Sequence, residues 1–421
     1  METTRTEITG ESHVGIGVGR THHEVVIIGG GTGGITVASQ LLRAREGMDI
    51  AVIEPSTEHY YQPLWTLVGG GIYPKERSRR SEISVMPDGV EWIRERATHV
   101  DPDRQIVETG SGRKVGYDFL VVAPGLTIDW GGVKGLKETV GRNGVCSIYD
   151  YEQAEVVSQM LHEFEGGEAY FTSPATPIKC GGAPQKIMWL ADDLWRRRKV
   201  RDRTEITFAT AGTVIFGVPG FKEALEELVE EREIHTLFEH HLVEIRPEQR
   251  EAVFAPLAPD GETEVRSYDL LHVTPPMKAP DFVSGSTLAH AEGESKGWMN
   301  VDIHTLQHPD YPNVFGVGDV AALPTAKTGA AVRKQAPVVA GNLLRVADGG
   351  TLGDDASRYD GYSSCPIVTG YGRLILAEFG YDNEPMPTFP FDQTKERRSM
   401  YILKKYGLPP LYWNLMLKGR A

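Results

Sequence analysis

The stretch His23–Ala44, HEVVIIGGGTGGITVASQLLRA, decides the fold class of this chain. A run of apolar residues leads into Gly29, Gly31 and Gly34, which fit the spacing G-x-G-x-x-G, and a segment of helical period follows. Such glycines allow a tight turn and let a pyrophosphate approach the N-terminus of a helix. Glu54 ends a second apolar run further on, where a carboxylate can accept hydrogen bonds from ribose hydroxyls. The pattern predicts a dinucleotide-binding domain.

Two later segments continue the α/β pattern. The string YDFLVVAPG is a buried strand that ends at Pro124 and Gly125, and FGVGDVA is a strand that ends at Gly318 and Asp319. Both resemble motifs of flavoproteins with two dinucleotide-binding domains, where the aspartate holds the ribityl chain, so their order implies FAD. A turn in which Asp319 caps the next helix is the alternative. Lys327, near the start of that helix, is either a positive charge at the pyrimidine edge of the flavin or a solvated lysine.

A second strand–loop–helix unit begins at Glu205, and its helix is expected at Phe221–Glu233. The glycines of this unit, Gly212, Gly217 and Gly220, are out of register for G-x-G-x-x-G. A nicotinamide pyrophosphate therefore has no evident cradle here, which points to a reductant other than NAD(P)H.

The sequence thus predicts an α/β protein with two Rossmann-like dinucleotide-binding domains and a C-terminal membrane-associating segment. The expected boundaries are a flexible tail at residues 1–21, an FAD-binding domain at 22–150 and 276–345, a second Rossmann-like domain without an NAD fingerprint at 151–275, and a C-terminal region at 346–421. The tail lacks the apolar core of a secretory signal, so no signal peptide is expected.

Composition excludes several classes of function. With 44 basic and 58 acidic residues among 421, the net charge of −14 argues against nucleic acid as a partner. The three cysteines are too few for a secreted disulfide framework and show no C-x-x-C spacing, so no metal site is expected. The chain contains no apolar run of about 18 residues, so no membrane-spanning helix is expected.

Two of the cysteines lie in informative surroundings. Cys180 follows Lys179 and precedes a Gly-Gly-Ala-Pro turn into a helix, and both a cation and a helix N-terminus lower the pKa of a thiol. Cys365 is followed by proline and then by a Gly-Tyr-Gly turn, which predicts an irregular segment. From spacing alone, both remain candidates for ordinary buried cysteines, as does Cys146 in GVCSIYD.

The C-terminal stretch, residues 391–421, reverses the charge of the chain. It contains seven basic and two acidic residues, which gives +5 on a protein of −14. Aromatic and aliphatic residues lie between these charges, among them Tyr401, Tyr412 and Trp413. Basic residues beside an aromatic, apolar face are typical of an interfacial segment, so we expect these three residues on the membrane side. A C-terminal helix docked on the body of the protein is the alternative.

Several strings carry a resemblance to a known family. KCGGAPQKIMWLADD, HVTPPM, YPNVFGVGD, SSCPIVTGYGRLILAEFGYD and FPFDQTKERRSMYILKKYGLPPLYWNLMLKG are similar to sulfide:quinone oxidoreductases of the branch that includes the mitochondrial enzymes. The similarity runs from about His23 to the C-terminus. This family belongs to the wider superfamily of disulfide-reductase-like flavoproteins.

The resemblance implies FAD as cofactor, sulfide as substrate and a membrane quinone as electron acceptor near the C-terminal aromatic residues. It also implies that Cys180 and Cys365 form a redox-active pair, in which Cys365 becomes a persulfide and Cys180 reacts as a thiolate. Lys179 would stabilise that thiolate. Glu155 would handle protons, unless it is only a solvated residue of a helix face. Cys146 is either a relay or flavin-attachment cysteine or a plain core cysteine.

The resemblance leaves further partners open. The persulfide sulfur would pass to a small acceptor such as sulfide, sulfite, cyanide or glutathione. A peripheral, monotopic membrane protein is expected, on the cytoplasmic membrane if the source is a bacterium, and a homo-oligomer is left open. Two alternatives remain: a type II NADH:quinone dehydrogenase, which predicts a second glycine fingerprint, and a non-catalytic, flavin-bearing sulfur carrier, which does not need the cysteine pair.

Overall fold

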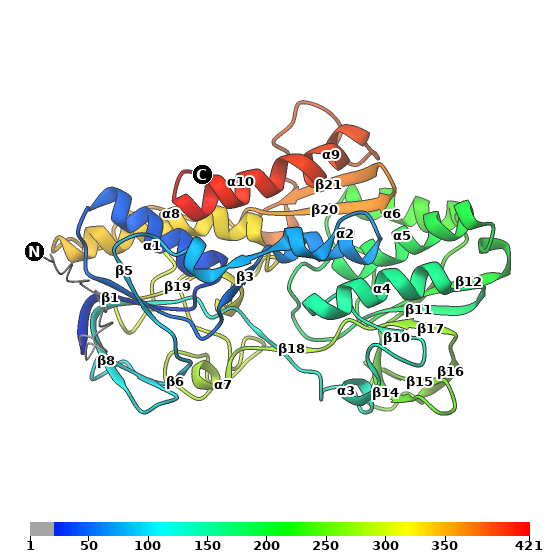
Figure 1. Cartoon of the computed structure of the whole chain (residues 1–421), viewed down its shortest axis with the longest axis horizontal. Coiled ribbons are helices and arrows are strands. Elements are labelled where there is room, and N and C mark those ends of the chain that lie inside the picture. Colours follow the sequence, from blue (N-terminus) through cyan, green and yellow to red (C-terminus); the bar gives the residue numbers. More distant parts are fainter. Residues whose placement is uncertain (1–20) are drawn as a thin grey trace, which may run out of the picture.

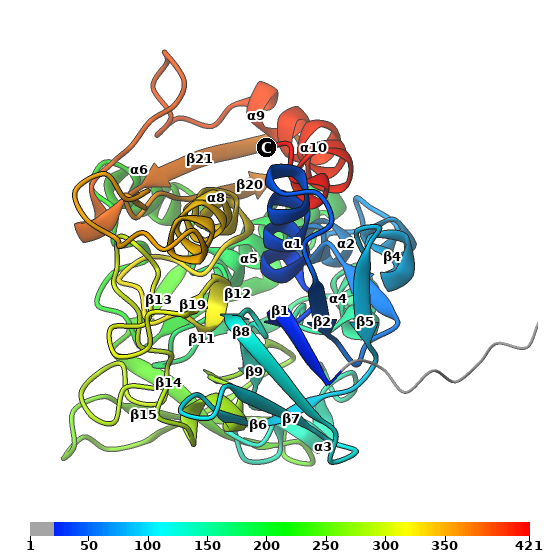
Figure 2. The same ribbon diagram turned by 90° about the vertical axis from the view of Figure 1, so that its left-hand side faces the viewer.

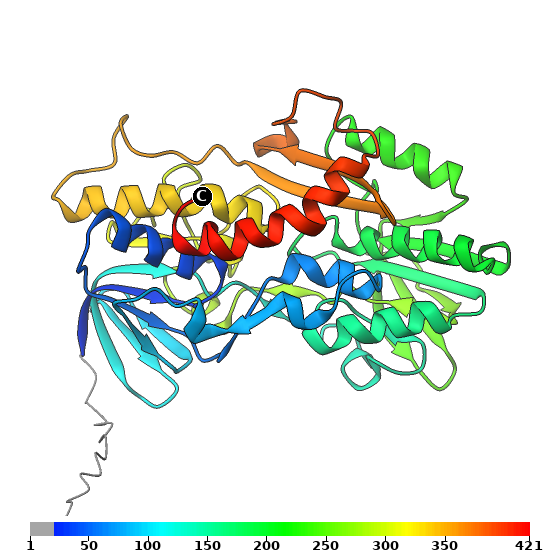
Figure 3. The same ribbon diagram turned by 45° about the horizontal axis from the view of Figure 1, so that its top comes forward.

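The computed structural model describes residues 21–421 and shows two α/β lobes side by side (Figure 1). A C-terminal hairpin and helices lie across both lobes, which Figure 3 shows in a tilted view. The predicted tail, residues 1–21, lies outside the described residues except for Thr21.

The first lobe is built on a seven-stranded sheet in the order β5-β2-β1-β8-β7-β6, with β19 paired to the end of β8. Neighbours β5, β2, β1, β8 and β19 run parallel, whereas β7 is antiparallel to both β8 and β6. The apolar second half of β1 is buried, as expected for a strand in a sheet that is covered on both faces. The strands are β1 (His22–Ile28), β2 (Ile50–Ile53), β5 (Val90–Ile93), β6 (Ala97–Asp101), β7 (Ile106–Thr109), β8 (Lys114–Val122) and β19 (Val314–Gly316).

The glycine turn between β1 and α1 (Thr32–Ala44) has the predicted form. Gly29 has φ +102°, and a Cβ there would lie 2.3 Å from the carbonyl oxygen of Ala123. A Cβ at Gly34 would lie 1.9 Å from the carbonyl oxygen of Gly29, so only glycine lets α1 pack this closely on the turn. α1 packs beside α8 (Gly329–Ala347), the helix that was expected to begin near Lys327.

The second lobe contains a parallel five-stranded sheet in the order β10-β17-β11-β12-β13, flanked by a small antiparallel sheet β14-β15-β16. The strands of the large sheet are β10 (Val145–Cys146), β17 (Leu270–His272), β11 (Gly167–Ser173), β12 (Thr204–Thr210) and β13 (His235–Phe238). The small sheet consists of β14 (His240–Arg246), β15 (Glu251–Pro256) and β16 (Glu264–Ser267). The helices of this lobe are α4 (Tyr151–Glu163), α5 (Ala183–Arg198) and α6 (Phe221–Glu231). Helix α6 ends two residues earlier than predicted.

Two short strands, β9 (Thr127–Ile128) and β18 (Met277–Lys278), pair where the chain passes between the lobes (Figure 1). The predicted boundary at residue 150 is therefore too late, because β10 already pairs with β17 in the second sheet. The remaining short elements are β3 (Glu58–Tyr60), β4 (Arg79–Ser81), α2 (Trp65–Gly69), α3 (Leu136–Thr139) and α7 (Asp281–Ser284).

The C-terminal region forms a hairpin and then a chain of short helices. The hairpin strands are β20 (Ser363–Gly370) and β21 (Arg373–Phe379), followed by α9 (Arg398–Ile402), a π-helical turn (Leu403–Gly407) and α10 (Leu408–Asn414). The predicted irregular segment around Cys365 is wrong, because this residue lies within β20. Proline at position 366 is compatible with a strand here because β20 has a single partner strand.

Candidate active site

The two predicted redox cysteines lie together. Cys180 follows β11 in a loop before α5, and Cys365 comes from β20, yet their Sγ atoms are 3.5 Å apart. Cys180 has φ +57°, a strained conformation for a residue with a side chain, and its N–H donates to the carbonyl oxygen of Lys327 at 2.8 Å. A Cβ at Gly182 would lie 2.4 Å from Sγ of Cys365, so this glycine makes room for the sulfur contact.

Two buried lysines face the sulfur pair. Nζ of Lys186, in the first turn of α5, donates to Sγ of Cys180 at 2.9 Å. Lys404, from the π-helical turn, donates to the carbonyl oxygen of Pro63 at 3.3 Å and interacts electrostatically with both sulfurs. Burial, followed by the charge of Lys186, lowers the pKa of Lys404 to about 7.

The sulfurs differ in acidity. The hydrogen bond from Cys365 and the charges of Lys186 and Lys404 hold the pKa of Cys180 well below the usual range of a thiol, against the effect of burial. The same hydrogen bond, together with burial, raises the pKa of Cys365. Cys180 is therefore the thiolate of the reduced pair, and Cys365 is its thiol donor.

Lys179 does not have the predicted place beside the thiolate. Its ammonium donates to Oε1 of Gln62 at 2.5 Å and lies 5.4 Å from the centre of the Trp65 ring. Burial lowers the pKa of Lys179 to about 8. The prediction failed because adjacent residues of a loop point in different directions. The first turn of α5 instead places the Lys186 side chain beside the sulfur of Cys180.

Glu155 and Cys146 also have places that sequence reasoning left open. Glu155 is half-exposed on α4, and its carboxylate forms an ion pair with Lys75 at 3.1 Å, which matches the solvated alternative. Cys146 is fully buried in β10, and burial raises its pKa to about 12. A thiol of that kind is almost entirely protonated near neutral pH, so its surroundings favour the core alternative.

The first glycine turn fits a dinucleotide pyrophosphate. The N-cap residue of α1 is Gly31, which has no side chain to cap the helix, so the first N–H groups of this helix can bind a ligand. A Cβ at Gly31 would meet no atom within 4 Å, which leaves open space above the turn. The Glu54 carboxylate accepts hydrogen bonds from the N–H groups of Gly30 at 2.8 Å and Ser56 at 2.7 Å, and so braces the turn in addition to its predicted role toward ribose.

The second and third flavin motifs lie near this turn. Gly125 has φ +73° and, like Gly31, has open space where a Cβ would be, directly after Pro124. β19 pairs with β8 and so brings Gly318 and Asp319 to the same end of the sheet as these turns. Burial raises the pKa of Asp319. These features are consistent with FAD held across the carboxyl ends of the strands.

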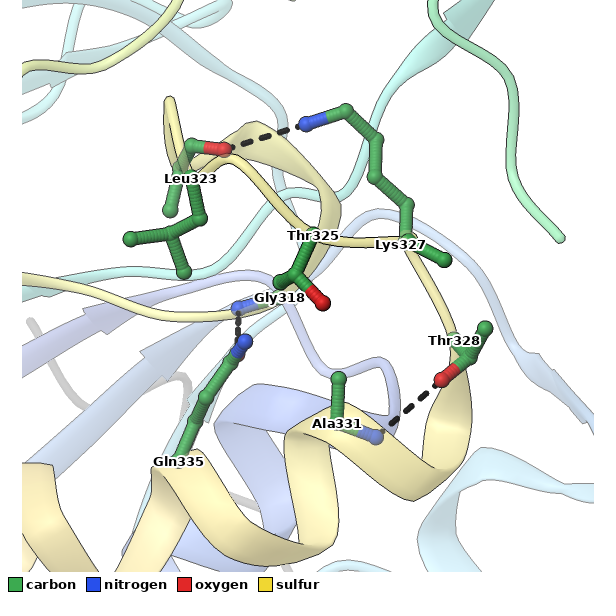
Figure 4. A pocket seen from close by; sticks show the side chains of 9 residues that line it. Gly318, Leu323, Thr325, Lys327, Thr328, Ala331 and Gln335 are labelled. Carbon is green, nitrogen blue, oxygen red and sulfur yellow. Dashed lines mark hydrogen bonds between the residues drawn. The ribbon is translucent and has the colours of Figure 1, made fainter. Parts of the chain in front are cut away.

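A pocket follows the third flavin motif at the start of α8 (Figure 4). Gln335 accepts a hydrogen bond from the Gly318 N–H at 2.9 Å, and Thr328 caps α8 through the Ala331 N–H. Lys327 donates instead to the carbonyl oxygens of Asp319 and Ala321 and lies 4.1 Å from the centre of the Trp298 ring. Its ammonium is thus used to fix the loop and is not simply solvated, while its place at the pyrimidine edge of the flavin stays a prediction.

The aromatic residues assigned to the membrane side point inward. Tyr401, Tyr412 and Trp413 are 8%, 2% and 4% exposed. The exposed apolar side chains of this stretch are instead Ile402, Tyr406 and Leu415. Sequence reasoning could not separate the two sets, because both alternate with basic residues along short helices. Among residues 21–421, no helix is both long and apolar enough to cross a membrane.

In the second lobe, a carboxylate of the protein itself binds the N-terminus of helix α6. At the start of α6, the Glu223 carboxylate accepts a hydrogen bond from the Gly220 N–H at 2.6 Å. Hydrogen bonds from its own backbone N–H and from that of Gly220 lower the pKa of Glu223, so the group is anionic at neutral pH. Negative charge at this position opposes a pyrophosphate.

Sequence reasoning missed Lys186 and Lys404. The signal for Lys186 was its position in the first turn of the helix that follows Cys180, inside the string KCGGAPQKIMWLADD. Lys404 has no local signal, because it reaches the sulfurs only when the C-terminal stretch folds across both lobes.

Comparison with known proteins identifies similar sequences and folds. Residues 23–161 match the family model "Pyridine nucleotide-disulphide oxidoreductase". The mitochondrial sulfide:quinone oxidoreductase of Mus musculus is 45% identical over 95% of this chain and 87% of its own length. That of Dictyostelium discoideum is 46% identical over 94% of this chain and 86% of its own length. The X-ray structure of the sulfide:quinone oxidoreductase from Aquifex aeolicus superposes with a TM-score of 0.81 over 96% of this chain and 93% of that one, at 24% identity.

Proposed function

Because this chain belongs to the sulfide:quinone oxidoreductase family, we propose that its Cys180–Cys365 pair is the place where sulfide is oxidised. The chain is an FAD-dependent oxidoreductase that takes electrons from sulfide and gives them to a quinone. One observation carries the assignment of the site: two sulfurs lie 3.5 Å apart, and the Lys186 ammonium lies 2.9 Å from one of them.

The sulfur step begins with the oxidised pair, a disulfide. Hydrosulfide attacks Sγ of Cys365 and forms a new sulfur–sulfur bond there, while the bond to Cys180 breaks and its electron pair stays on Cys180. Lys186 stabilises this charge, which makes Cys180 the better leaving group of the two. The products are a persulfide on Cys365 and a thiolate on Cys180.

The outer sulfur then leaves Cys365 with a small nucleophilic acceptor, for which sulfide, sulfite, cyanide and glutathione are the candidates. Transfer to the acceptor leaves the reduced pair, Cys180 as thiolate and Cys365 as thiol once it has taken up a proton, and two electrons and that proton must be removed before their disulfide re-forms. When bound, FAD supplies the two-electron acceptor between the cysteines and the quinone. The turns at Gly29–Gly34 and Gly318–Asp319 would hold it, with Glu54 toward its ribose.

The membrane surface is assigned to the exposed residues of the C-terminal stretch. Ile402, Tyr406 and Leu415 are 47%, 60% and 42% exposed, and basic residues stand near them in the sequence. Apolar side chains flanked by cations suit the boundary between lipid head groups and acyl chains. We assign a peripheral attachment to these three residues, on the side from which a quinone arrives. This replaces the assignment to Tyr401, Tyr412 and Trp413, which are buried.

The NADH dehydrogenase alternative is not favoured. Its nucleotide would need the turn between β11 and α5, where the strand order of the second sheet reverses, and this turn carries Cys180 of the sulfur pair. The sulfur-carrier alternative is not favoured either, since the relatives are named as oxidoreductases.

The function is tested by adding sulfide or NADH anaerobically to the purified, FAD-loaded protein and recording the visible flavin absorbance. One equivalent of sulfide, with sulfite present, should bleach the flavin, and added quinone should restore the absorbance. NADH should leave it unchanged. Stoichiometric bleaching by NADH and not by sulfide would contradict the proposal.

A further inference from the structure

A chain of buried hydrogen bonds joins α10 to the first glycine turn, and the sulfur chemistry does not use it. Oη of Tyr412 lies 2.9 Å from Oγ1 of Thr32, the first residue of α1, and 2.6 Å from Nε2 of His59. On the other side of the imidazole, Nδ1 of His59 lies 3.1 Å from the carbonyl oxygen of Gly30 and 3.2 Å from Oε2 of Glu82. His59, Glu82 and Tyr412 are each at most 3% exposed.

The donors of this chain follow one direction. Nδ1 of His59 faces two acceptors, a carbonyl and a carboxylate oxygen, so it carries a proton. In the neutral imidazole, Nε2 then accepts from the Tyr412 hydroxyl, which in turn accepts from Thr32. The hydrogen bonds therefore run from the Thr32 hydroxyl through Tyr412 and His59 back to the Gly30 carbonyl oxygen. This series of hydrogen bonds begins and ends on the glycine turn, at Thr32 and at Gly30.

The same C-terminal stretch contacts α1 at a second place. Oγ of Ser39, further along α1, donates to the carbonyl oxygen of Leu417 at 2.7 Å. The helices α10 and α1 lie next to one another near the C-terminus (Figure 2). The Ser39 bond fixes the body of α1, whereas the Tyr412 bond fixes the residue at its open N-terminus.

We propose that Tyr412, acting through His59 and Thr32, is a positioning residue for FAD: the C-terminal stretch closes on the glycine turn and sets the affinity for the cofactor. The turn must present its N–H groups in one geometry to bind a pyrophosphate, and a loop that is already ordered loses less entropy on binding. The buried chain supplies that order before FAD arrives. The inference rests on FAD binding and not on the proposed sulfur step.

The direct test is Tyr412→Phe, which removes one hydroxyl and keeps the ring that stacks on Tyr61 at 4.2 Å between ring centres. His59 and Thr32 then lose a buried partner, and the turn must be ordered by FAD itself. The dissociation constant for FAD, measured by the fluorescence of released flavin, should rise about tenfold or more. Excess FAD should restore flavin reduction by sulfide, because the variant leaves the cysteine site intact.

Ser39→Ala is the matched control, since it removes a second hydrogen bond between α1 and the C-terminal stretch, the one to Leu417. It should leave the FAD dissociation constant close to that of the unaltered protein, even if thermal unfolding of both apoproteins shifts equally. Unchanged FAD affinity in Tyr412→Phe, or an equal loss in both variants, would overturn the proposal. Should Tyr412→Phe not fold, Thr32→Val removes the same hydrogen bond from the half-buried Thr32 side. Unchanged FAD affinity in that variant would likewise overturn the proposal.

Discussion

Replacing Lys186 by methionine should raise the pKa of the Cys180 thiol, because the change removes the ammonium that donates to its sulfur at 2.9 Å. Lys186 is only 2% exposed, so water cannot replace the lost charge. A hydrogen bond to a charged group contributes about 1.5–3 kcal/mol, and about 1.36 kcal/mol corresponds to one pKa unit. The midpoint of thiolate formation should therefore move upward by about one to two pH units. Methionine keeps the apolar stem, so the packing of α5 should survive.

The assay is the rate at which iodoacetamide alkylates Cys180 in the reduced, FAD-loaded protein, followed against pH by mass spectrometry of the peptide that contains it. The rate reports the thiolate fraction, because the thiolate is the nucleophile. Lys179→Met is the matched control, since Lys179 is adjacent to Cys180 in the chain but donates to Gln62. A shifted midpoint in Lys179→Met together with an unshifted one in Lys186→Met would refute the assignment.

Three further predictions follow from the same site. Gly182→Ala should place a Cβ 2.4 Å from Sγ of Cys365 and push the sulfurs apart, so sulfide-dependent flavin reduction should slow about a hundredfold with FAD still bound; stopped-flow rates equal to wild type would argue against the contact. Cys146→Ala should keep near-normal turnover and lose about 1 kcal/mol of unfolding free energy in a urea titration, because this thiol is a core residue; loss of turnover at full FAD loading would give it a chemical role. The pKa of Lys404 is lowered to about 7, so its ammonium loses its proton as pH rises through that value and supports the Cys180 thiolate less. Below that pH the ammonium is charged and lowers the pKa of Cys180, so Lys404→Met should move the midpoint of the alkylation profile upward, and an unshifted midpoint would contradict the prediction.

The glycine turn could be predicted because its requirements are local. Gly29 needs a positive φ and Gly34 needs a missing Cβ, and both needs appear within six residues of sequence. The strand before the turn and the helix after it have their own periodicities, so one continuous stretch of sequence is enough to predict the whole strand–turn–helix unit.

The sulfur site could be predicted only in part, because its members come from distant segments. The cysteine pair was recognised through a resemblance, but the choice between Lys179 and Lys186 depends on the direction of each side chain after α5 has formed. Lys404 and Tyr412 depend on how the C-terminal stretch crosses both lobes. A basic and aromatic composition indicates an interfacial segment, but it does not say which of its residues face the protein.

The central claim is that sulfide sulfur is first bound by Cys365, and it is tested most directly by locating that sulfur. The oxidised, FAD-loaded protein is mixed anaerobically with one equivalent of sulfide, without an acceptor, and is then alkylated and analysed by peptide mass spectrometry. The account predicts one additional sulfur atom on the peptide that contains Cys365 and an ordinary alkylated thiol on the peptide that contains Cys180. An additional sulfur found only on Cys180, or on neither cysteine while the flavin is reduced, would contradict it.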